Sequence, residues 1–238
     1  MDLRFLLDTL LALLTGVPLT LELAVSSLAL GGLLALPLAL MRMSPVAPLD
    51  WLARSYVFAF RSTPLLVQIF LIYYGLGQFR EVRASLLWPI LREPYWCAVI
   101  ALTLNTAAYS SEIIRGGILA VPFGQIEAAR AVGMSGLTAL RRIIVPQAYR
   151  QALPAYGNEL ILMIKATSLA SIITIMEVTG IAAKLISETF RAVEVFIVAG
   201  AIYLVINFVV TRLVHFAEHR LTPHLRQAPV PAAARERA

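Results

Sequence analysis

Long apolar runs alternate with short polar segments along this chain. A helix rises 1.5 Å per residue, so about 20 apolar residues cover the ~30 Å hydrocarbon core of a bilayer. Five runs are candidates for such helices: residues 17–41, 64–76, 95–114, 153–174 and 195–214. The pattern predicts an all-α integral membrane protein with about five transmembrane helices, organised as one membrane domain.

The second of these runs is the shortest, and its start is marked by residues that favour a helix N-terminus. Ser62 or Thr63 can cap the helix, and Pro64 fits its first turn. The preceding stretch, residues 51–60, is amphipathic. We expect that stretch to lie along the membrane interface before the chain turns inward.

Composition excludes the main alternatives to a membrane protein. Hydrophobic residues make up 59% of the chain, charged residues only 14%, and the mean hydropathy is +0.79. Charged residues are about 25% of a typical soluble protein. A soluble domain of this length could not hide so much apolar surface, and intrinsic disorder requires the opposite composition.

The distribution of basic residues predicts the orientation in the membrane. With five spans, residues 42–62, residues 115–150 and the tail from 212 share one side, and they hold 13 of the 20 basic residues. Basic loops mark the cytoplasmic side, so the N-terminus is expected outside and the C-terminus in the cytoplasm. This bias also accounts for the net charge of +6 without nucleic acid as a partner.

Residues 121–146 form the most informative polar segment. Residues 125–132 favour a helix, which Gly133 can end by adopting a positive φ. Residues 137–145 favour a second helix, and Pro146 either stops it or opens the next one. A plain amphipathic connector is the alternative interpretation of this spacing.

This segment resembles a known family. It carries Glu-Ala-Ala, three residues, Gly, nine residues, Ile, one residue, an aliphatic residue and then Pro, which is the EAA loop of ABC-importer permeases. The matching positions are Glu127, Ala128, Ala129, Gly133, Ile143, Val145 and Pro146. Val145 stands where the family usually has Leu. Residues 61–77, 101–135 and 152–172 are similar to permeases of the polar amino acid uptake subfamily, which transport histidine, lysine, arginine, ornithine, opines or glutamine.

The resemblance covers about residues 15–222 and implies a type I ABC importer permease in a bacterial cytoplasmic (inner) membrane. Residues 1–16 would be a periplasmic N-terminal segment, 17–222 the transmembrane permease domain, and 223–238 a disordered cytoplasmic tail. Residues 121–146 would be the coupling loop that docks on the ATPase. The implied partners are an ABC ATPase homodimer, a second permease subunit (a copy or a paralogue), an extracytoplasmic amino-acid-binding protein and membrane lipid.

Enzyme chemistry is not expected on this chain. It has no G-x-x-x-x-G-K-[ST] loop, so ATP and Mg²⁺ would bind the partner ATPase, and this chain would hold no cofactor. It also lacks G-x-S-x-G and H-E-x-x-H motifs. His215 and His219 have the spacing of a helical metal pair, but no further ligands accompany them in the sequence, so no metal site is predicted.

Polar residues inside spans are costly and usually face a bundle interior or water. The candidates for the substrate pathway are Glu22, Gln68, Asn105, Tyr109, Glu112, Lys165 and Thr167. Simpler roles remain open: Glu22 at the interface, Glu112 paired with Arg115, and Lys165 snorkelling or paired with an acid.

The intramembrane carboxylates favour a cationic substrate. Together with the resemblance, they predict a basic amino acid (arginine, lysine, histidine or ornithine) or an opine. The alternatives are a permease for glutamine or glutamate and, in a different class, a membrane scaffold without a pathway.

Overall fold

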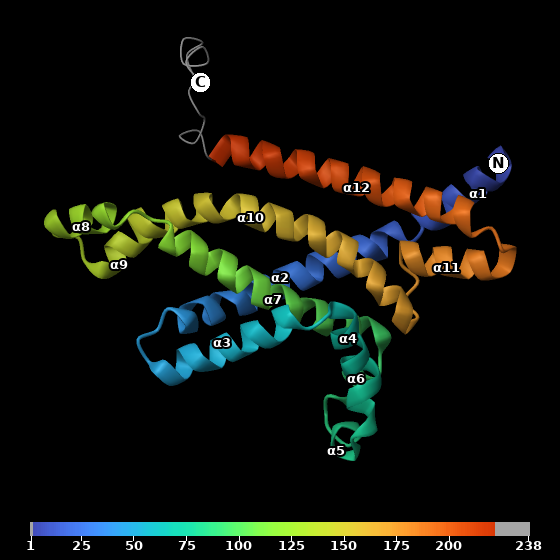
Figure 1. Ribbon diagram of the computed structural model, residues 1–238, viewed down its shortest axis with the longest axis horizontal. Helices are drawn as coiled ribbons and strands as arrows, with labels where there is room; N and C mark the ends of the chain where they lie inside the picture. Colours follow the sequence, from blue (N-terminus) through green and yellow to red (C-terminus); the bar gives the residue numbers. More distant parts are fainter. Residues whose placement is uncertain (1, 222–238) are drawn as a thin grey trace, which may run out of the picture.

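The computed structural model describes residues 2–221, and this part of the chain is helical without β-strands. Four long helices run roughly along the same axis: α2 (Val17–Arg42), α7 (Pro94–Leu119), α10 (Val145–Ala166) and α12 (Ala192–Leu221) (Figure 1). They coincide with four of the five predicted spans, and the all-α membrane fold is confirmed. The helix α1 (Leu3–Leu14) precedes α2 and occupies most of the expected N-terminal segment.

The second crossing is broken into two parts. The helix α3 (Ala47–Ser62) is followed by α4 (Leu65–Phe70), the π-helical turn η1 (Leu71–Gly75) and the 3₁₀ turn η2 (Leu76–Gln78). The two parts meet at an angle of 104°. We expected residues 51–60 to lie along the interface, but α3 instead packs alongside α2 and α7.

Two of the segments between the predicted spans contain helices. Residues 80–93 form the short helices α5 (Arg80–Arg83) and α6 (Trp88–Leu91), which project from the bundle (Figure 1). Residues 178–189 form α11 (Val178–Thr189), in the polar segment between the fourth and fifth predicted spans. The fourth span continues from α10 through the 3₁₀ segment η4 (Thr167–Ile173), which ends at Thr174 with φ of 69°. A bend of 46° then leads into α11.

The predicted helix–turn–helix is present, with altered bounds. The helix α8 (Phe123–Ala131) ends before Gly133, whose φ of +77° confirms the predicted turn. The second element comprises α9 (Gly136–Ala139) and the π-helical turn η3 (Leu140–Ile144), which leads directly into α10. Pro146 lies in the first turn of α10 and therefore opens that helix. The predicted disordered tail, residues 223–238, lies outside the described residues.

Small residues let α2 and α7 approach closely. A Cβ atom on Gly31 would lie 2.7 Å from Cγ2 of Thr106, which is too close for any larger side chain. Such close approach drives helix association in membranes, because lipid tails offer no hydrophobic gain between helices. A cluster of buried hydrophobic side chains joins α1, α11 and α12 around Leu13, Val178 and Val195.

Candidate functional site

The segment α8–η3 lies at the end of the molecule opposite the N-terminus, and α12 runs toward the same end (Figure 1). Glu127 and Ala128 are exposed, whereas Ala129 is only 4% exposed and packs inward. Ile143 and Pro146 are half-buried where the segment joins α10. The residues of the EAA pattern thus divide into an exposed part and an anchoring part.

The turn at Gly133 is closed by backbone hydrogen bonds. The amide of Met134 donates to the carbonyl of Ala129 at 3.0 Å, and the amide of Val132 donates to that of Ala128 at 3.1 Å. A Cβ atom on Gly133 would meet nothing within 4 Å, so space does not require glycine there. The positive φ does, because L side chains adopt it at a cost.

The segment α8–η3 carries exposed apolar side chains before and after this turn. Phe123, Val132 and Leu137 are 65%, 72% and 76% exposed, respectively. The small residue Ala128 on α8 is exposed as well.

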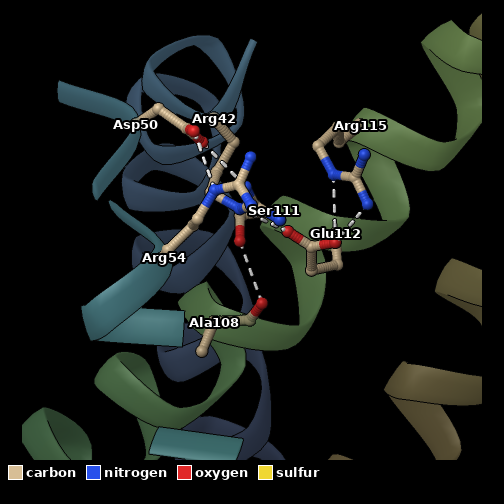
Figure 2. A network of polar contacts seen from close by, with 7 residues as sticks. All are labelled: Arg42, Asp50, Arg54, Ala108, Ser111, Glu112 and Arg115. Carbon is tan, nitrogen blue, oxygen red and sulfur yellow. Dashed lines mark hydrogen bonds and ion pairs between the residues drawn. The ribbon is translucent and has the colours of Figure 1, made fainter. Parts of the chain in front are cut away.

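A network of ion pairs joins the ends of α2, α3 and α7 (Figure 2). Nε of Arg42 lies 3.0 Å from Oε1 of Glu112, and Nη1 of Arg42 lies 2.8 Å from Oδ1 of Asp50. Arg54 binds the other oxygen of Asp50 at 2.7 Å, and Arg115 binds Oε2 of Glu112 at 2.7 Å. Both oxygens of each carboxylate are therefore occupied. Glu112 pairs with Arg115, which is the simpler role foreseen for it.

Gln68 and Asn105 stabilise the bend between α3 and α4. Nε2 of Gln68 donates to the carbonyl of Phe60 at 2.9 Å and to Oγ1 of Thr63 at 2.9 Å. Nδ2 of Asn105 on α7 donates to Oε1 of Gln68 at 3.0 Å. Because the bend leaves helix carbonyls without their usual partners, these amides act as local braces.

The remaining pathway candidates do not gather at one place. Glu22 is exposed and accepts a hydrogen bond from the Tyr95 hydroxyl at 2.8 Å. The hydroxyl of the buried Thr167 donates to the carbonyl of Ile164 at 2.7 Å. Lys165 is exposed beside a cavity of about 580 Å³ between α10 and α12.

Tyr109 and Glu112 do share a cavity. It has a volume of about 420 Å³ and opens between α2, α3 and α7, where Arg42, Arg54 and Arg61 also line it. The guanidinium of Arg61 lies over the Tyr109 ring, 5.1 Å from its centroid. Arg61 was not among the residues predicted for the pathway. The signal was available, because Arg54 and Arg61 are seven residues apart and therefore share one face of α3.

Glu177 is a second residue that the sequence did not single out. It is fully buried and accepts hydrogen bonds from the Gly180 amide at 2.8 Å and the Tyr203 hydroxyl at 2.6 Å. The hydroxyl of Thr20 lies 3.4 Å from Oε2. This carboxylate caps α11 and joins it to α2 and α12. An acidic residue just before a helix is a capping signal, but the sequence pattern did not predict a helix at residues 178–189.

Among residues 2–221, no group of three His, Cys, Asp or Glu side chains is placed to hold a metal ion. The carboxylates described above are bound by arginines, by a tyrosine hydroxyl or by backbone amides.

Comparisons with known proteins agree with this interpretation. Residues 10–223 match the family model described as binding-protein-dependent transport system inner membrane component. The octopine transport system permease protein OccM of Rhizobium radiobacter is 63% identical over 94% of this chain and 92% of its own length. The nopaline transport system permease protein NocM of Agrobacterium fabrum (strain C58) is 60% identical, over 95% and 94%. The arginine ABC transporter permease protein ArtM of Escherichia coli (strain K12) is 47% identical, over 72% and 77%.

Solved structures share the fold. The crystal structure of an amino acid ABC transporter with histidines superposes with a TM-score of 0.83 at 38% identity, covering 92% of this chain and 99% of that chain. An inward-facing MetNI methionine ABC transporter gives a TM-score of 0.68 at 20% identity, over 94% and 99%, and shows the fold alone. The expected multi-pass inner membrane protein without enzymatic activity is confirmed. Membership of the family also implies an ATPase and a binding protein as partners. The chain belongs to the family of inner membrane components of binding-protein-dependent transport systems, as a permease subunit of an ABC importer.

Proposed function

We propose that this chain forms part of the translocation pathway of an importer for opines or basic amino acids. The observation that carries the proposal is the identity of 60–63% to octopine and nopaline permeases over almost the whole chain. The arginine permeases at 47% identity point to the same chemistry, because octopine and nopaline both contain an arginine unit.

The N-terminus lies outside the cell and the C-terminus in the cytoplasm. Two independent features support this orientation. The side that holds 13 of the 20 basic residues is the cytoplasmic side by the positive-inside rule. The segment α8–η3 lies at the opposite end of the molecule from the N-terminus, where an ATPase in the cytoplasm could reach it (Figure 1).

Residues 121–146 couple the permease to an ATPase homodimer. Glu127 and Ala128 face outward for the partner, and the turn at Gly133 holds the two short helices at a fixed angle. ATP and Mg²⁺ bind the partner, whose conformational cycle moves the permease between inward and outward states.

A second permease subunit, either a copy or a paralogue, completes the pathway, and an extracytoplasmic binding protein delivers the substrate. The exposed arginines of α3 support a second subunit. Arg54 and Arg61 belong to a crossing helix pair, where a charged side chain has to face water or protein rather than lipid.

Uptake into proteoliposomes tests the proposal. The complete transporter, with its ATPase and binding protein, is reconstituted and supplied with labelled octopine, nopaline, arginine or glutamine. ATP-dependent uptake of one of the first three is expected. Uptake of glutamine alone establishes the alternative substrate class, and assembly without any uptake favours a scaffold.

A further inference from the structure

The cavity between α2, α3 and α7 contains one arginine that differs from its neighbours. Arg42 and Arg54 are bound to Asp50, and Arg42 is also bound to Glu112. Within residues 2–221, Arg61 makes no ion pair or side-chain hydrogen bond, and its contact is the face of Tyr109.

The position of Arg61 is held by its surroundings. It lies in the last turn of α3, just before the 104° bend. Gln68 donates to the carbonyl of Phe60, the residue before Arg61, and Asn105 holds Gln68 in place. The guanidinium carbon lies over the ring of Tyr109 in a cation–π contact, which uses none of the N–H donors of Arg61.

A guanidinium placed in this way recognises a planar anion. Its N–H donors match the two oxygens of a carboxylate, and such bidentate bonds are stronger than neutral ones. The other charges of the cavity do not compete, because Glu112 has both oxygens bound by Arg42 and Arg115. An exposed arginine within a crossing unit also has to face a polar path or another subunit.

We propose that Arg61, supported by Tyr109, binds the carboxylate group of the transported amino acid or opine. This inference rests on the proposed function, since it assigns one end of the substrate to one side chain. It gives Gln68 and Asn105 the role of positioning residues, which hold the bend that presents Arg61 to the cavity. It also moves Glu112 from a substrate contact to a structural partner of two arginines.

Agmatine provides a direct test, because it is arginine without the carboxylate. Binding of arginine and agmatine is measured by calorimetry on the purified permease–ATPase complex without the binding protein. The variants are Arg61→Gln, Arg61→Lys and, as a control, Arg92→Gln. Arg92 is exposed and makes only a long 3.5 Å contact with Glu93.

Wild type and the control should bind arginine more tightly than agmatine. Arg61→Gln should weaken arginine binding by roughly 10- to 100-fold, as expected for the loss of a charged hydrogen-bonding partner. Agmatine binding should stay unchanged, and Arg61→Lys should retain part of the preference because it keeps the charge without the planar geometry. A merely structural role of Arg61 would instead weaken both ligands equally.

Three results would overturn the assignment. These are equal arginine binding by wild type and Arg61→Gln, parallel loss of both ligands, or separation of the permease subunits in Arg61→Gln during size-exclusion chromatography. The last result would identify a carboxylate of the partner subunit as the ligand. Uptake by the wild-type proteoliposomes is scored separately, so a wrong substrate class and a wrong carboxylate site give different outcomes.

Discussion

Arg42 on α2 lies 3.0 Å from Glu112 on α7, although the two residues are 70 positions apart in the chain. Their side chains are only 13% and 16% exposed. The pair therefore joins two crossing helices at one end, and Asp50 and Arg115 extend the same network to the start of α3 and along α7 (Figure 2).

Replacing Glu112 with Gln should destabilise this end of the bundle. The change keeps the shape of the side chain but leaves Arg115 without a carboxylate and Arg42 with Asp50 alone. A loss of about 1–3 kcal/mol is expected, because both partners are largely removed from solvent. Thermal unfolding of the detergent-solubilised protein, followed by size-exclusion chromatography, measures the effect.

The matched control for that prediction is Glu93→Gln. Glu93 pairs with Arg92 at 3.5 Å, and both side chains are more than half exposed, so the pair should contribute little. An unfolding midpoint that falls equally in both variants would show that the Glu112 network contributes no more to stability than the exposed pair of Arg92 and Glu93.

Gly133→Ala should weaken coupling to the ATPase without preventing folding. A Cβ atom there meets no neighbour, so the cost arises from the φ of +77° and amounts to about 1–2 kcal/mol. The bulkier Gly133→Leu should uncouple uptake further. Co-purification of the ATPase and ATP-driven uptake are the measurements.

Gly116→Ala serves as the control for backbone conformation. It also has open space around its Cβ position, but it lies inside α7 with an ordinary φ. Uptake by Gly133→Leu that equals that of wild type would contradict the assignment of residues 121–146 as the coupling loop.

Gly31→Val should separate α2 from α7. The first added carbon would already lie 2.7 Å from Thr106, and backbone atoms of Thr103 stand 3.1 Å away, so the helices have to move apart. Overpacking of this kind costs about 1–3 kcal/mol. Gly200→Val on α12, where nothing lies within 4 Å, is the control and should leave the unfolding midpoint nearly unchanged.

Glu177→Ala should release α11 from the bundle. The substitution removes the helix cap and leaves the buried Gly180 amide without its side-chain acceptor, while the Tyr203 hydroxyl keeps its contact with the Thr179 hydroxyl at 3.2 Å. Unsatisfied buried donors cost about 1–3 kcal/mol each. Faster amide hydrogen exchange in residues 178–189 is the expected sign.

Tyr203→Phe completes a double-mutant cycle for that prediction. Because the two side chains share a hydrogen bond of 2.6 Å, the combined variant should lose less stability than the sum of the two single losses. Strict additivity would mean that the contact between them contributes nothing.

The elements that were predicted correctly are those encoded by neighbouring residues. Long apolar runs indicated α2, α7 and α12, and the glycine after residues 125–132 indicated the turn at Gly133. Local patterns failed where distant residues decide the structure. Gln68 and Asn105 are 37 positions apart and meet only after the bend has formed.

The helix α11 illustrates the same limit. Lys184 and Glu188 make its sequence polar enough to suggest a loop, while the contacts that fix its start come from Thr20 and Tyr203 in other helices. Arg61 was evident as a charged residue, but its lack of an ion pair among residues 2–221 depends on which acids Arg42, Arg54 and Arg115 bind. Pairing of this kind cannot be derived from spacing alone.

The location of Glu177 has a consequence for the order of assembly. Its partners lie near the two ends of the chain, since Thr20 belongs to α2 and Tyr203 to α12. Synthesis at about 5–20 residues per second separates these two residues by roughly 10 to 40 seconds. During that interval the first helices are already in the membrane with this junction incomplete. The final helix therefore closes the protomer, and a nascent chain truncated before it leaves a buried carboxylate without its shortest hydrogen bond.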